Sequence, residues 1–295
     1  MIVVTGGSGF IGTHVCSALA DEGHQVRIID IAPPPFGGKA EFVRASVLDE
    51  LRLAKLFAGA DAVIHLAALI DVQTSLSDPF SDFQVNAQGT LNVLEAARRA
   101  GIKKVSYASS AAVYGDPSSM PVSESTIVNP LSPYGLSKLT GERYVLLYNS
   151  LYGMENNALR LFNVYGKGQP PHSPYSGVIT KFANAIAAGR QPVIFGEGNQ
   201  TRDFVHADDV AHAFSLSLGS RGCNSPINIG SGTEMSILSL AGKMFSLSGK
   251  APDIKFMPER AGEIKRSCAD ITLARRELGF KTSVSMDNGL KELLA

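Results

Sequence analysis

The feature that most constrains this chain is a glycine-rich turn directly after a short β-branched run near the N-terminus. Ile2–Val4 predicts a strand, and residues 10–21 predict a helix. The turn between them contains Gly6, Gly7, Gly9 and Gly12. Glycines allow positive φ and a close approach of the backbone to a pyrophosphate, and the helix N-terminus presents free N–H groups to that anion. No Gly-Lys-Ser/Thr follows, which excludes a Walker A loop, so the turn predicts dinucleotide binding in an α/β fold.

A carboxylate stands at the end of the second predicted strand, which runs from Gln25 to Asp30. Asp30 follows Gly12 by 18 residues. A carboxylate at this position accepts hydrogen bonds from the adenosine ribose and repels a 2′-phosphate. No Arg or Lys follows before Lys39, so we expect NAD rather than NADP. The alternative is that Asp30 only ends a strand.

Short β-branched runs and longer amphipathic stretches alternate through the first half of the chain. We expect strands at about 42–43, 62–66, 104–109 and 158–162, and helices at about 50–58, 82–100 and 133–151. Such alternation is typical of a parallel sheet with helices on both faces. The sequence therefore predicts a Rossmann-type doubly wound α/β fold.

The pattern changes near residue 165, where a stretch rich in glycine and proline follows. Beyond it we expect helices near 177–188, 237–247, 271–278 and 289–294, with short strands around 193–195 and 203–205. This shift predicts a smaller α/β domain after the large one.

The charge balance restricts the partners. The 27 Lys and Arg residues match 27 Asp and Glu residues, which argues against bulk attraction to nucleic acid or an anionic membrane. Apolar stretches fall well short of the roughly 20 residues of a membrane-spanning helix, and the N-terminus has no signal-peptide pattern. Cys16, Cys223 and Cys268 form no CxxC motif, so we expect neither a disulfide framework nor a zinc site. We expect a cytoplasmic protein without a nucleic-acid or membrane partner.

Two further elements carry chemistry that a dinucleotide can use. Tyr134 and Lys138 lie four residues apart, on one face of a predicted helix that begins after Ser132-Pro133. The ammonium can stabilise a tyrosinate and lower the phenol pKa from about 10 towards neutrality, so Tyr134 can act as general base and acid. Ser110 follows a predicted strand, where parallel sheets bind ligands, and can hydrogen-bond a substrate alcohol. The alternatives are an amphipathic helix face and an ordinary turn serine.

Together these elements resemble the extended short-chain dehydrogenase/reductase superfamily over essentially the whole chain, and within it the UDP-galactose (UDP-glucose) 4-epimerases. The other motifs that carry the resemblance are His65-Leu-Ala-Ala68, Ser109-Ser110-x-x-Val-Tyr-Gly115, Leu159-Arg-x-Phe162-Asn163 and Arg202-Asp-Phe-Val-His206-x-x-Asp209. The resemblance implies an NAD-binding Rossmann domain of residues 1–165 plus about 204–230. It implies a sugar-nucleotide domain of residues 166–203 plus 231–295.

The resemblance also assigns roles to individual residues. It implies that Ser110, Tyr134 and Lys138 are catalytic. The residues implied to bind NAD are Gly6, Gly9, Phe10, Ile11, Gly12, Asp30, Val47, Leu48, Leu66, Ala67, Ala68, Tyr134 and Lys138. Those implied to bind the UDP-sugar are Ser110, Asn163, Val178, Phe195, Arg202, Arg260, Glu263 and Ser267. Guanidinium groups suit a diphosphate; the alternatives are a surface ion pair between Arg202 and Asp203 and an exposed cation at Arg260.

Two departures from the family pattern bear on the activity. Ser46 stands where the family has an adenine-contacting Asp, which leaves the backbone at Val47 or Leu48 for that contact. Ala111 and Ala112 occupy the place where sugar-nucleotide dehydratases carry Asp-Glu or Glu, and where the related decarboxylases tend to carry Glu. No acid or base for eliminating water stands there, which favours an epimerase.

The implied reaction inverts C4 of UDP-glucose or UDP-galactose through a 4-keto sugar. Tyr134 removes the proton of the 4-hydroxyl while hydride passes from C4 to NAD⁺. The ketose then turns about its diphosphate, hydride returns to the opposite face of C4, and Tyr134 gives the proton back. The cycle is redox-neutral. Ser267 occupies the family position that limits the hexose pocket, and its small size leads us to expect that N-acetylhexosamine forms also fit.

Other activities stay open at this point. One is a UDP-glucuronate 4-epimerase or another NAD-dependent sugar-nucleotide oxidoreductase. A more remote one is a non-catalytic NAD-sensing or interaction protein, although such a protein does not need Tyr134, Lys138 and Ser110.

Helix pairing in related enzymes leads us to expect a homodimer through residues 82–100 and 133–151. The apolar contact would come from Leu91, Leu94, Leu139, Val145 and Leu146. The alternative is that these residues cover the sheet.

We expect no catalytic metal, because the six histidines form no metal-binding pattern. The Asp pair Asp208 and Asp209, after His206, is expected to cap the next helix. His14, His24 and His65 are expected to be isolated.

Overall fold

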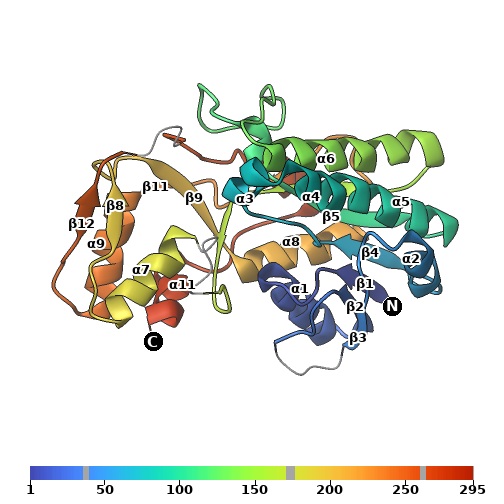
Figure 1. Ribbon diagram of the computed structural model, residues 1–295, viewed down its shortest axis with the longest axis horizontal. Coiled ribbons are helices and arrows are strands. Elements are labelled where there is room, and N and C mark those ends of the chain that lie inside the picture. Colours follow the sequence, from blue (N-terminus) through green and yellow to red (C-terminus); the bar gives the residue numbers. More distant parts are fainter. Residues whose placement is uncertain (36–39, 171–176, 260–263, 295) are drawn as a thin grey trace.

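The computed structural model describes residues 1–35, 40–170, 177–259 and 264–294. They form two lobes, and the larger lobe is built on a seven-stranded parallel sheet with the strand order β10-β6-β5-β4-β1-β2-β3 (Figure 1). Its strands are β1 (Ile2–Thr5), β2 (Val26–Asp30), β3 (Glu41–Arg44), β4 (Ala62–His65), β5 (Lys104–Ser110), β6 (Asn157–Leu161) and β10 (Ile227–Ile229). The predicted Rossmann-type doubly wound fold is confirmed.

Helices cover both faces of this sheet because successive strand side chains point to opposite sides. One face carries α1 (Phe10–Asp21), α8 (Ala207–Gly219) and α10 (Thr272–Leu278). The other carries α2 (Glu50–Leu56), α5 (Gly89–Arg99) and α6 (Pro133–Tyr152). Val4 packs into the first core and its neighbour Val3 into the second. Among the described residues, none of the helices is both long and apolar enough to cross a membrane.

The smaller lobe has a core of its own. Its strands are β7 (Asn163–Tyr165), β8 (Val193–Phe195), β9 (Thr201–His206), β11 (Glu234–Ser236) and β12 (Lys255–Met257), and its helices are α7 (Val178–Ala187), α9 (Ile237–Ser248) and α11 (Met286–Leu294). The chain returns to the large lobe, where β10 pairs with β6 and α8 packs on α1. It returns once more at α10, whose Leu278 lies in the core of the large lobe. The domain boundaries given above stay a prediction.

The predicted helix over 82–100 is confirmed as one continuous helical stretch, but it begins at Pro79 and contains a π-helical turn that the sequence pattern did not indicate. The structure has α3 (Val72–Ser77), α4 (Pro79–Phe83), a π-helical turn η1 (Gln84–Gln88) and then α5. The π turn brings Asn86 against the loop after β4, where its side chain accepts a 2.8 Å hydrogen bond from Leu69 N and donates one of 2.8 Å to Leu69 O. Such turns within helices often occur at functional sites. Here the turn fixes a loop that borders the cavity described below.

The predicted cap of α8 is also wrong. The side chain of His206, rather than either Asp, accepts the free N–H of Asp208 at the start of the helix. Asp209 instead accepts from the backbone N and the hydroxyl of Ser283, each at 2.7 Å. His14 is not isolated, because its Nδ1 lies 2.5 Å from an oxygen of Asp208. In the part of the chain that the structure describes, no group of three or more His, Cys, Asp or Glu residues could hold a metal ion.

His65 joins three elements of the large lobe instead of standing alone. Its Nδ1 lies 2.7 Å from the hydroxyl of Thr5 on β1, and its Nε2 lies 3.0 Å from the hydroxyl of Thr90 on α5. Burial of the ring, together with the charge of Lys138, lowers its pKa to about 3. His65 is therefore neutral in the folded protein at neutral pH.

This depressed pKa makes the stability of the fold depend on pH. Below about pH 6.5 the unfolded chain binds a proton at His65 that the folded protein does not accept until about pH 3. The free energy of unfolding should therefore fall as the pH drops through this window, by up to about 1.4 kcal/mol per pH unit from this one group. Urea unfolding of the wild type and of His65→Asn between pH 7 and pH 4 measures this pH dependence, which should be weaker in the variant. Equal slopes in the two proteins would contradict this reading.

Candidate active site

The glycine turn leaves room for a ligand at the start of α1. Gly6 has a φ of +72°, and a Cβ at Gly12 would lie 2.2 Å from the carbonyl oxygen of Gly6. Gly9 precedes the helix without a capping side chain, so the first N–H groups of α1 face outward for an anion. The buried hydroxyl of Ser8 has no hydrogen-bond partner among the described residues. An uncapped helix start and a partnerless hydroxyl fit a pyrophosphate.

Asp30 lies at the same end of the cavity, beside the glycine turn. One of its carboxylate oxygens accepts a 3.0 Å hydrogen bond from Ser8 N, which ties the end of β2 to the glycine turn. The other accepts a 3.3 Å bond from Ala32 N. The carboxylate stands beside the turn as a ribose-binding acid requires, so the residues present fit NAD.

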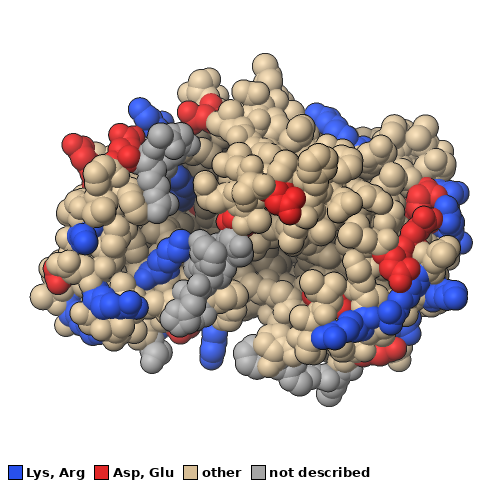
Figure 2. Space-filling model, viewed as in Figure 1, with Lys and Arg blue, Asp and Glu red and all other residues tan. Residues whose placement is uncertain are grey.

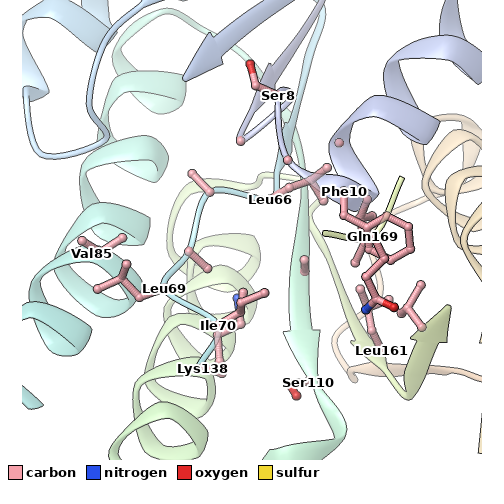
Figure 3. Close-up of a pocket in the computed structure, with 18 of the residues that line it drawn as sticks. Ser8, Phe10, Leu66, Leu69, Ile70, Val85, Ser110, Lys138, Leu161 and Gln169 are labelled. Atoms are coloured by element: carbon pink, nitrogen blue, oxygen red, sulfur yellow. The ribbon is translucent and has the colours of Figure 1, made fainter. Parts of the chain in front are cut away.

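A cavity of about 730 Å³ extends from this turn along the carboxyl edge of the sheet. Ser8 lies towards one end of the close-up, and Ser110 and Lys138 towards the other (Figure 3). The residues predicted to bind ligands that line it are Gly6, Gly9, Phe10, Ile11, Gly12, Asp30, Val47, Leu66, Ala67, Ala68, Ser110, Tyr134, Lys138, Asn163 and Val178. The fold thus brings most of the predicted site together from distant parts of the sequence.

Four predicted residues do not line this cavity: Leu48, Phe195, Arg202 and Ser267. Leu48 is exposed beside Val47. Phe195 and Arg202 lie on β8 and β9 of the small lobe, where one Nη of Arg202 donates 2.8 Å hydrogen bonds to the carbonyls of Thr201 and Ile264. Arg260 and Glu263 lie outside the described residues.

The alternative for Arg202, an ion pair with Asp203, does not hold. Asp203 is buried and accepts hydrogen bonds from Ser231, Gly232 and Ala269. Its carboxylate therefore serves to tie β9 to the segments that follow β10 and precede α10.

Sequence reasoning missed several residues that line the cavity. Leu69 and Ile70 follow Ala68 directly, so extending the strand-end motif by two residues would have found them. Gln169 carries no comparable local signal. It is held by a hydrogen bond from Thr180 on α7, a contact that only the folded chain creates.

Tyr134 is held in the first turn of α6. Ser132 caps the helix by accepting from Gly135 N at 3.0 Å, and Pro133 occupies the position where a missing N–H costs nothing. The backbone N of Tyr134 donates to the buried hydroxyl of Ser75 on α3 at 3.2 Å. The start of α6 is therefore fixed against α3, which follows the cavity-lining residues Leu69 and Ile70.

The electrostatics differ from the expectation that Lys138 lowers the pKa of Tyr134. Burial raises the pKa of the phenol above its ordinary value, and a hydrogen bond with Ser110 only partly opposes this. Burial also lowers the pKa of Lys138 to about 7, partly offset by the charges of Asp82 and Glu142. Desolvation is the largest effect on the pKa of both groups.

The fold and the cavity define a dinucleotide-dependent enzyme with a tyrosine, a lysine and a serine at the far end of the cofactor site. The model of the NAD dependent epimerase/dehydratase family matches residues 2–230, and the chain belongs to that family. Its cofactor is NAD.

Three similar proteins support this placement. The chain is 41% identical over 300 residues to a putative UDP-glucose 4-epimerase of Methanocaldococcus jannaschii, covering 100% of this chain and 97% of that one. A structure of UDP-glucose 4-epimerase from Thermotoga maritima with UDP-glucose is 33% identical, with a TM-score of 0.94 over 99% of this chain and 97% of that one. UDP-N-acetylglucosamine 4-epimerase from Methanobrevibacter ruminantium in complex with UDP-N-acetylmuramic acid is 37% identical, with a TM-score of 0.93 over 99% and 96%.

Proposed function

We propose that the protein is an NAD-dependent epimerase that inverts C4 of a UDP-hexose, with UDP-glucose and UDP-galactose as substrates. The observation that carries this is one cavity lined both by the glycine turn and by Ser110, Tyr134 and Lys138. The 3₁₀ turn η2 (Ala111–Tyr114) follows Ser110 and presents two alanines where an eliminating enzyme needs an acid or base. The similar proteins named above are 4-epimerases of UDP-sugars or are named as such.

Tyr134 moves the proton in the proposed reaction. It takes the proton of the sugar 4-hydroxyl as C4 is oxidised and returns it when C4 is reduced on the other face. NAD, when bound at the glycine turn and Asp30, supplies a reversible acceptor for the hydride. Burial favours the protonated phenol. We propose that the ammonium of Lys138, four residues further along α6, stabilises the tyrosinate that takes up the sugar proton. Ser110 orients the hydroxyl, and no proton or electron is consumed over the cycle.

The diphosphate of the substrate is proposed to bind in the small lobe. Arg202 on β9 is half-buried there, and it contributes together with Arg260. Asn163 and Val178 line the cavity where the two lobes meet. The three cysteines are all free, in keeping with a reducing compartment, and we place the enzyme in the cytoplasm.

The proposal is tested by incubating the purified protein with UDP-glucose or UDP-galactose without added NAD and separating the products. We expect interconversion to an equilibrium mixture, because the cofactor is regenerated within each cycle. Tyr134→Phe should lower kcat by about 10²- to 10⁴-fold, since it removes the general acid and base. The variant should still copurify with NAD. A strict requirement for stoichiometric NAD(P)H would instead identify a net oxidoreductase, and near-normal activity of Tyr134→Phe would exclude its role.

We further propose that N-acetylated hexoses are accepted. Ser267 is small and half-buried, and one similar structure is a UDP-N-acetylglucosamine 4-epimerase. Ser267→Tyr should lower kcat/KM for UDP-N-acetylglucosamine by about tenfold or more, because its ring would occupy the space of the N-acetyl group and a misfit of one methylene already costs about 1–3 kcal/mol. Activity of the same variant on UDP-glucose is the internal control. A wild type that turns over UDP-glucose but not the N-acetyl form would contradict the proposal.

A homodimer is proposed through α4, α5 and α6, but not through all the residues first expected. Leu94 and Val145 are fully buried in the core, so they cover the sheet. Large apolar side chains of this face that are exposed are Phe80, Phe83, Leu136, Tyr144, Leu147 and Leu151. Figure 2 shows few charged side chains over this part of the large lobe. An apolar surface of this kind indicates a protein contact.

Leu147→Glu should convert the dimer into a monomer, because it places a charge in the centre of that apolar face. Light scattering after size-exclusion chromatography at micromolar concentration measures the mass. Leu238→Glu is the matched control, since Leu238 is similarly exposed but lies on α9 of the small lobe. A monomeric wild type, or equal dissociation by both variants, would rule out this interface.

A further inference from the structure

The buried ammonium of Lys138 needs a group that holds it in place. The residue is only 3% exposed, yet it faces the cavity from α6. Removing a cation from water is unfavourable unless neighbouring groups compensate. Two carboxylates, Asp82 and Glu142, lie near enough to favour its charged form.

Glu142 is fully engaged by other groups, and Asp82 is engaged through one of its two oxygens. Glu142 accepts hydrogen bonds of 2.9 and 2.6 Å from Arg160 and one of 2.7 Å from Ser109. Asp82 accepts a 2.9 Å bond from Asn86, while its second oxygen has no partner among the residues that the structure describes. These groups supply negative charge, but the hydrogen bonds of Glu142 direct it towards Arg160 and not towards Lys138.

The direct contact of the ammonium is aromatic. Nζ of Lys138 lies 4.5 Å from the centroid of the Tyr107 ring, within the range of a cation–π interaction. An aromatic face attracts a cation without accepting a conventional hydrogen bond. The N–H donors of the ammonium therefore stay available for groups inside the cavity.

Tyr107 is itself firmly placed. It lies in the middle of β5, is 1% exposed, and its hydroxyl donates to the main-chain oxygen of Lys138 at 3.3 Å. Helix α6 makes room for the ring with Gly141, where a Cβ would lie 2.6 Å from the hydroxyl oxygen of Tyr107 and 3.0 Å from Cζ. A glycine weakens a helix interior. Gly141 is therefore explained by the ring of Tyr107, which needs the space that a side chain would fill.

We propose that Tyr107 is a positioning residue for Lys138, whose ring face fixes the ammonium at the end of the cavity and leaves its donors free. The proposal rests on the role given above to Lys138. It requires that the electrostatic character of the ring matters, and not only its volume.

Charged and titratable groups lie near this ammonium on the helices and the strand that pack around it. Asp82 acts on it from α4 and Glu142 from α6, and its own charge reaches His65 on β4. The fluorinated protein is compared with Tyr107→Phe, because both lack the hydroxyl and they differ in the charge of the ring. Because a cation–π contact stabilises the charged amine, a weaker ring face must lower the pKa of Lys138.

The test changes the charge of the ring at nearly constant shape. Tyr107→Phe keeps the ring face, and 3,4,5-trifluorophenylalanine incorporated at position 107 withdraws negative charge from it. We expect Tyr107→Phe to stay within about threefold of wild-type kcat, and the fluorinated protein to lose about tenfold near pH 8. The alkaline limb of its kcat profile should move down by about 0.5–1 pH unit, with KM for UDP-glucose nearly unchanged.

A second readout does not depend on turnover. Protein labelled with ¹³C at the lysine ε-carbons is titrated by NMR, and Lys138→Met assigns the resonance. The Lys138 signal should titrate near pH 7 in the wild type and at lower pH in the fluorinated protein. Equal titrations in a folded fluorinated protein would overturn the proposal. Full activity of Lys138→Met would instead remove the role of Lys138 itself, which is a separate failure.

Gly141 provides an independent variant. Gly141→Ala should displace the ring of Tyr107 and lower the titration of Lys138, and the effect should shrink when combined with Tyr107→Phe, which removes the clashing oxygen. Gly242→Ala is the matched control, because Gly242 also lies inside a helix, α9, but has nothing within 4 Å of the added Cβ. A Lys138 titration equally unaffected by both glycine variants would count against the proposal.

Discussion

A lysine buried at the carboxyl edge of a parallel sheet is the constraint on which the rest of the site depends. Two carboxylates place negative charge near Lys138. Glu142 is hydrogen-bonded by Arg160 and Ser109, and one oxygen of Asp82 is hydrogen-bonded by Asn86. A buried ion pair of this kind contributes little net stability, but losing one partner is costly. The catalytic end of the cavity is therefore rigid because its charges are mutually dependent.

At the opposite end of the cavity, backbone N–H groups rather than charged side chains are placed to bind an anion. Gly6 and Gly12 approach each other so closely that no side chain fits between them, which lets the start of α1 reach a pyrophosphate with backbone N–H groups. Ser8 and Asp30 add one hydroxyl and one carboxylate to this surface. A chain with no net charge can in this way bind highly charged ligands, because the attraction is local.

The sequence predicted the elements whose signals are local. The glycine turn, the alternation of strands and helices, and the pairing of Tyr134 with Lys138 on one helix all follow from short-range spacing, and the fold brings them to one cavity. The π turn around Asn86 and the burial of Leu94 and Val145 instead of Phe83 and Leu147 depend on how helices lie against the sheet. Contacts such as Gln169 with Thr180, or Tyr107 with Gly141, join residues of different elements, and no local sequence pattern predicts them.

The path of the chain between the lobes also has a consequence for synthesis. The edge strand β10 of the large sheet lies at residues 227–229, and Phe280, which follows α10, is fully buried in the same core. The core of the small lobe likewise needs Leu290 of α11. The core of the large lobe is incomplete until Phe280 has left the ribosome, and that of the small lobe until Leu290 has. Until those residues are synthesised, the apolar faces of β1 to β6 lack their last partners in the nascent chain.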